Sequence, residues 1–95
     1  MKTITVELLK KDIEEGTFTE STKCPMTKAL NRAGYGDYKD VVGMYRKDIK
    51  GGKKIKTSSE YKIAIELLSK MELNKKGHKE YDKPKDFTVT FQADI

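Results

Sequence analysis

Two side chains of this chain are natural candidates for nucleophilic chemistry, the single cysteine Cys24 and the single histidine His78. Cys24 precedes Pro25 and so falls at the start of a predicted helix, where the positive end of the helix dipole lowers the pKa of a thiol. A cysteine nucleophile also needs a base within hydrogen-bond reach. Because His78 lies in a distant predicted loop, we expect Cys24 to be structural, and a thiol-dependent enzyme is the least favoured hypothesis.

Metal and phosphate sites are not indicated by the spacing of the residues that would form them. One Cys and one His cannot supply the ligand set of a structural zinc site. The neighbouring acids Asp12, Glu14 and Glu15 lack the pattern of a calcium loop. Glycines at 34–36 follow a predicted helix and glycines at 51–52 precede a strand, so both segments are interpreted as turns. We therefore expect no metal, no cofactor, no catalytic residue and no enzyme activity.

The positive charge is concentrated in one part of the chain. The formal net charge is +5, from 20 Lys and Arg against 15 Asp and Glu. Residues 32–56 carry eight basic and three acidic side chains, whereas the segments on either side are neutral. Such a segment attracts phosphate or an acidic protein surface. A solvated face is the alternative, because 18 of the 20 basic residues are Lys and not Arg, which binds phosphate bidentately.

Tyr35, Tyr38 and Tyr45 flank the predicted basic hairpin, which lies in the second half of this segment. Interleaved aromatic and basic side chains can stack bases and hold phosphates, and tyrosine also anchors protein interfaces. The alternative is that these rings pack on the sheet and cover loop edges. The residues that we predict to bind a partner are Tyr45, Arg46, Lys47, Lys50, Lys53 and Lys54.

Hydrophobic periodicity predicts the elements that position these residues. Alternating apolar residues predict strands at 3–9 and 87–93. We expect these two strands to pair with each other at the centre of the sheet, since both are the most apolar. Helices are predicted at 10–16, from Cys24 to Gly34, and from Thr57 to about residue 73. Thr57 and Glu60 match a capping box, and a stripe predicted to be buried follows it: Tyr61, Ala64, Ile65, Leu68 and Met71.

A basic hairpin completes the predicted elements. Strands at 41–46 and 53–57 are joined by a turn that contains Gly51 and Gly52. The order is then β-α-β-β-α-β in a single domain of residues 1–95. This order predicts an α+β two-layer sandwich, with a small, largely antiparallel sheet of about four strands and two helices on one face. Strand order and oligomeric state stay open.

Composition indicates a folded domain of the cytoplasm. The chain is 36% hydrophobic and 37% charged, and its mean hydropathy is −0.74. No apolar run approaches the roughly 20 residues of a membrane span. The first residues lack the apolar stretch of a signal peptide, and a single cysteine fits a reducing compartment. We expect no membrane association.

Several short segments form a recognisable set: residues 4–6 (Ile-Thr-Val), Asp12-Ile13 and Gly16, Cys24-Pro25 before Ala29-Leu30, and Phe87 at the start of the last predicted strand. In these segments the chain resembles small uncharacterised proteins encoded by phages and prophages. The resemblance implies a small accessory protein of a mobile element. Such proteins are often stoichiometric inhibitors of host defence, anti-CRISPR proteins included, and act in the bacterial cytoplasm.

The sequence therefore leaves two hypotheses for the function of the protein. The first is a non-catalytic inhibitor that binds a host protein or ribonucleoprotein, such as a CRISPR-Cas effector. The second is a direct nucleic-acid-binding module that uses the basic hairpin at 46–56, whose affinity would fall steeply with salt.

Overall fold

The computed structural model describes residues 1–20, 22–40, 43–46 and 53–95. The first and last strands, β1 (Lys2–Leu8) and β5 (Phe87–Ala93), pair antiparallel from Lys2↔Ala93 to Leu8↔Phe87. The predicted pairing of the terminal strands is confirmed, but their predicted place at the centre of the sheet is wrong, because β1 and β5 form a two-stranded sheet of their own. Alternation turns Ile4, Val6 and Leu8 inward, where each is at most 1% exposed.

Three helices follow the predicted periodicity. They are α1 (Lys10–Glu15), α2 (Pro25–Arg32) and α3 (Ser59–Lys75). The predicted stripe on α3 is confirmed, because its buried residues are those that the sequence indicated: Tyr61, Ala64, Ile65, Leu68 and Met71. On α2, Met26, Ala29 and Leu30 are buried, but Ala33 is exposed because the helix has ended there.

Both longer helices end at a glycine. Gly34 has φ +93° and Gly77 has φ +104°, a left-handed conformation that costs other L-residues energy. After α2, the Tyr35 N–H donates to the Leu30 carbonyl at 2.8 Å, and after α3 the His78 N–H donates to the Leu73 carbonyl at 3.1 Å. These bonds satisfy carbonyls that the helix leaves open.

The start of α3 differs from the predicted capping box. Ser58, not Thr57, is the N-cap residue, and its side chain makes no capping bond to the helix backbone. The reason is tertiary: Thr57 forms a β-bridge with Ala93. Ser58 is held there too, since its N–H donates to the Gln92 carbonyl and its Oγ accepts from the Gln92 N–H, both at 2.8 Å. The last strand therefore fixes where the helix begins.

A second sheet contains β2 (Tyr38–Asp40), β3 (Met44–Arg46) and β4 (Lys53–Lys54), all antiparallel. The α+β class and the antiparallel pairing of β3 with β4 are confirmed. The predicted turn at Gly51 and Gly52 lies outside the described residues. The expected single sheet of four strands differs from the structure, where the described strands lie in two sheets and β2 was not predicted. The two sheets stay separate because the chain after β4 pairs with β3 only through Ile55 before it crosses to β5.

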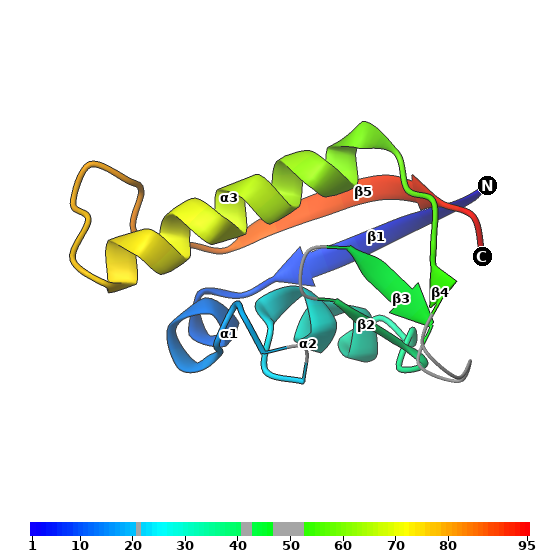
Figure 1. The fold of residues 1–95 in the computed structure, drawn as a ribbon, viewed down its shortest axis with the longest axis horizontal. Coiled ribbons are helices and arrows are strands. Elements are labelled where there is room, and N and C mark those ends of the chain that lie inside the picture. Colours follow the sequence, from blue (N-terminus) through cyan, green and yellow to red (C-terminus); the bar gives the residue numbers. More distant parts are fainter. Residues whose placement is uncertain (21, 41–42, 47–52) are drawn as a thin grey trace.

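One core joins these elements. Figure 1 shows α3 lying along β5, with β1 between them and the smaller sheet, and with both termini at the same end. Tyr61 of α3 packs edge-on against Phe91 of β5, with ring centroids 4.9 Å apart. The remaining core residues include Ile13, Leu30, Met44 and Ile55. The crossing segment 55–58 is thereby fixed between α3 and the smaller sheet.

Candidate functional site

A groove of about 1000 Å³ lies between the first half of α3 and the strands β3 and β4, among the residues that the structure describes. The crossing segment 55–58 lines the groove together with the residues on either side of it, Lys54 and Ser59, and Met1 is also part of the lining. We call it the lysine-rimmed groove, after Lys54, Lys56 and Lys62. Concave sites with an apolar floor and a few polar groups are where proteins most often hold ligands.

The floor of the lysine-rimmed groove is apolar. It is made by Met44 from β3, Ile55 from the crossing segment, and Tyr61 and Ile65 from α3. All of these residues are also part of the core, and none is more than 8% exposed. The floor is therefore a rigid surface whose shape the core packing sets.

Strand alternation and helical spacing place the charges on the rim. In the extended segment after β4, Ile55 points into the core, while Lys54 and Lys56 on either side of it are exposed. Lys62 and Glu66 come from α3, one turn apart. The rim thus has three ammonium groups against one carboxylate, so its field attracts negative charge.

Gly43 brings Tyr45 and Lys54 together at the hairpin end of the groove. A Cβ built on Gly43 would lie 3.3 Å from Lys54 Cε and 3.7 Å from Tyr45 Cε2. The Lys54 stem therefore lies over the glycine beside the half-buried Tyr45 ring. Tyr45 and Lys54 are also cross-strand partners in the hairpin.

The predicted binding residues are only partly gathered in this groove. Lys54 lines it and Tyr45 lies beside it, while Lys53 is exposed on β4 and pairs with Arg46 through the strand backbones. Lys47 and Lys50 lie outside the described residues. Sequence analysis missed Lys56 and Lys62 as site residues. The alternation Lys54-Ile55-Lys56 could have indicated the first, but nothing in the sequence places Lys62 beside them.

The first turn of α3 lines the end of the groove that is opposite Gly43 and the hairpin. The Ser58 hydroxyl and the Glu60 backbone N–H hydrogen-bond the Glu60 carboxylate, which lowers the pKa of Glu60. Glu60 itself is exposed and lies on the β5 side of the helix. Its charge therefore faces away from the lysine rim.

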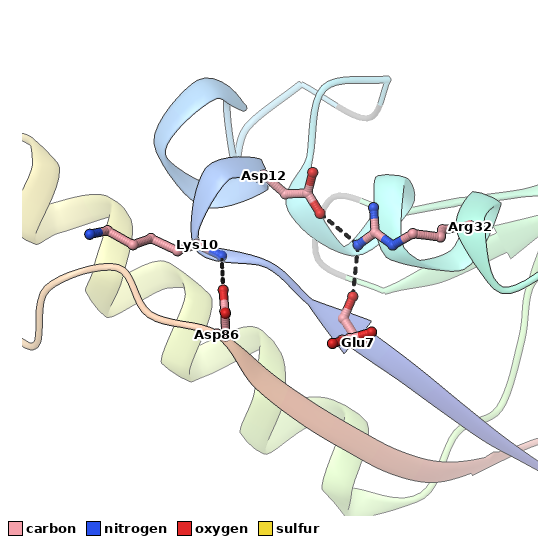
Figure 2. Close-up of polar contacts among 5 residues, drawn as sticks. All are labelled: Glu7, Lys10, Asp12, Arg32 and Asp86. Atoms are coloured by element: carbon pink, nitrogen blue, oxygen red, sulfur yellow. Dashed lines mark hydrogen bonds and ion pairs between the residues drawn. The ribbon is translucent and has the colours of Figure 1, made fainter.

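Of the acids that the metal analysis considered, Asp12 forms an ion pair with an arginine side chain. Asp12 is 5% exposed, and its Oδ2 accepts a hydrogen bond of 2.6 Å from Arg32 Nη2. The same Nη2 donates to the Glu7 carbonyl at 2.8 Å, as Figure 2 shows. Figure 2 also shows Asp86, which accepts from the Lys10 N–H at 2.6 Å at the start of α1. These contacts tie α1 to β1, α2 and β5.

Cys24 and His78 are placed differently. Cys24 is the N-cap residue of α2, as predicted, and it is fully buried. His78 is exposed, and its Nδ1 lies 3.6 Å from a Glu80 carboxylate oxygen. The two side chains therefore differ in solvent access: His78 is exposed to solvent and Cys24 is not.

Neither a family model nor a curated protein nor a solved structure matches this chain. Within the described ranges, no group of three or more His, Cys, Asp or Glu residues is arranged to hold a metal ion. The same part of the chain has no helix with the length and apolar character needed to cross a bilayer.

Proposed function

We propose that the protein is a small, non-catalytic interaction protein that binds a host protein or ribonucleoprotein and inhibits it, with a CRISPR-Cas effector as the leading target class. The observation that carries this proposal is the lysine-rimmed groove. Its apolar floor offers buried contact area, and its rim selects for negative charge on the partner. The resemblance to phage and prophage proteins supplies the biological setting, the bacterial cytoplasm.

Charge and apolar surface have separate roles in such an interface. The exposed rim lysines, Lys54, Lys56 and Lys62, attract an acidic partner and raise its rate of association. Burial of partner side chains on the floor sets how slowly the complex dissociates. A partner segment with acidic residues flanking apolar ones fits this division.

A direct nucleic-acid-binding module is the second candidate, and the position of Tyr45 and Lys54 as cross-strand partners that both lie next to Gly43 favours it. An aromatic ring beside an ammonium group can stack a base while the cation holds the phosphate. The two candidates differ in salt dependence. Nucleic-acid affinity falls steeply with salt, whereas a protein interface with an apolar centre keeps most of its affinity.

The test compares the wild type with a groove variant, Lys54→Glu/Lys56→Glu/Lys62→Glu, in bacteria that carry an active CRISPR-Cas system. A control variant, Lys11→Glu/Lys79→Glu/Lys83→Glu, makes the same change of charge at exposed lysines outside the groove. We expect the wild type and the control to restore plaque formation by a targeted phage, and the groove variant to lose this effect.

Affinity capture from the same lysates, with and without nuclease, identifies what is bound. Recovery of one effector protein after nuclease treatment, lost in the groove variant, supports the inhibitor. Recovery of nucleic acid alone, lost at high salt, replaces it with the second candidate. Equal inhibition by the groove variant and the wild type would show that the groove is not the interface.

A further inference from the structure

The second edge of β5 is open over part of its length. Gln92 exchanges both of its main-chain bonds with Ser58, so its N–H and C=O point away from β1. Because residues two apart in a strand point their polar groups to the same side, those of Thr88 and Thr90 also point away from β1. No main-chain partner among the described residues meets Thr88 or Thr90 there. Such an edge is a template for another strand.

An apolar strip runs beside this open edge. A hollow of about 310 Å³ separates the edge from α3, and its apolar lining includes Ile63, Leu67, Phe87 and Val89. Ile63 is 62% exposed, although it sits on a helix whose other apolar residues are buried or half-buried. A strand added to β5 would cover this strip with its inward side chains.

We propose that a second copy of this chain pairs with the open edge, β5 against β5, about a two-fold axis through Val89. Thr88 and Thr90 lie symmetrically about Val89, so in an antiparallel pair each Thr88 exchanges its main-chain bonds with Thr90 of the second copy. The strand order becomes β1-β5-β5-β1. One continuous sheet then has two α3 helices on one face, which meet through Ile63 and Leu67.

Charge complementarity favours a second copy as the occupant. Glu60 lies beside Thr90 at one end of the open edge, and Lys85 precedes β5 at the other. Antiparallel pairing brings Lys85 of the second copy up to Glu60. Lys85 can exchange its partner, because its 3.7 Å ion pair with Asp82 is exposed to solvent, with side-chain exposures of 57% and 69%. Each dimer gains this contact twice.

The length of the interface limits its strength. Ser58 occupies the edge at Gln92, so pairing between copies must end before that residue. A short edge of this kind favours a dimer that dissociates on dilution. The dimer does not involve the lysine-rimmed groove, so the proposal of a dimer can be tested separately from the proposed function.

Sedimentation velocity of the full chain tests the proposal, over about 1 to 500 μM. We expect the mass to rise from 10.9 kDa toward twice that value. Thr88→Pro removes an outward N–H that bonds to no main-chain acceptor among the described residues, and Ile63→Lys puts a charge in the apolar strip. Each should weaken the dimer by about tenfold or more. Ile95→Lys, an apolar-to-charged change at another exposed isoleucine, is the matched control and should change nothing.

A charge exchange makes the test specific. Glu60→Lys should weaken the dimer, and adding Lys85→Glu to it should restore association. Circular dichroism melting curves for each variant separate loss of pairing from loss of folding. A monomer at all concentrations would overturn the proposal, as would a dimer that Thr88→Pro and Ile63→Lys leave unchanged. Binding of an extended peptide to a monomeric chain would also overturn it, since the edge would then serve another protein.

Discussion

Lys75, in the last turn of α3, donates a hydrogen bond of 2.7 Å from Nζ to the main-chain carbonyl of Ile13, 62 positions earlier. The same ammonium group donates to the Gly16 carbonyl at 3.0 Å. At the opposite end of α1, the Asp86 carboxylate accepts from the Lys10 N–H. The helix has only six residues and no side-chain cap of its own at Leu9. Charges from the C-terminal half therefore cap both ends, with the signs that the helix dipole requires.

Replacing Lys75 should destabilise the fold through α1. Lys75→Met keeps most of the side-chain volume but leaves the Ile13 and Gly16 carbonyls without their charged donor. Hydrogen bonds to charged groups contribute about 1.5–3 kcal/mol, so we expect a loss of that order in the free energy of unfolding. Urea denaturation monitored by circular dichroism measures it. Lys76→Met, at the exposed neighbouring position, is the control, and an equal loss in both variants would refute the capping role.

Removing Arg32 and removing Asp12, the two members of one ion pair, should lower the free energy of unfolding by different amounts. The side chain of Asp12 is 7% exposed and that of Arg32 is 40% exposed. Arg32→Ala leaves a buried carboxylate without its cation and should cost about 3 kcal/mol. Asp12→Ala leaves a guanidinium that reaches water and still binds the Glu7 carbonyl, so it should cost about 1 kcal/mol. Comparing the urea midpoints of the two variants tests this order, and a larger loss for Asp12→Ala would contradict it.

The parts of the fold that follow from local pattern could be predicted from the sequence. The alternation of Ile4, Val6 and Leu8 sets the inward face of β1 wherever the strand lies. The stop at Gly34 follows from the need for a positive φ after α2. These features depend on residues within one or two turns of each other, so the local sequence contains the information.

The parts that depend on distant segments could not be predicted. Thr57 fits a cap by its type, but Ala93 holds it in a β-bridge, so the helix starts one residue later than expected. The division into two sheets arises where the chain leaves β3 for β5, and no local signal marks that crossing.

The candidate site, too, depends on segments that are distant in the sequence, so only part of it could be predicted. Lys54 was predicted because it lies in a basic run, whereas Lys62 joins it only through the packing of α3 beside the hairpin. Runs of charge in a sequence locate a charged segment. They do not locate the surface to which that segment contributes.

The contact of Ser58 with Glu60 predicts a titration that NMR can follow. The Ser58 hydroxyl and the Glu60 N–H stabilise the ionised carboxylate, so the pKa of Glu60 is lower in the folded chain than in the unfolded one. A lowered folded-state pKa contributes stability above the unfolded-state pKa, and this contribution is lost as the pH falls through the folded-state pKa. Carbon-detected titration of Glu60, in native buffer and in urea, measures both values.

Ser58→Ala should raise the folded-state pKa of Glu60 toward its ordinary value, because the largest stabilising hydrogen bond is gone. The same change removes the acceptor for the Gln92 N–H, so amide exchange at Gln92 should become faster. Ser59→Ala alters the adjacent exposed serine and should leave both quantities unchanged. If the two variants shift Glu60 equally, the lowered pKa comes from the helix terminus as a whole and not from the Ser58 hydroxyl.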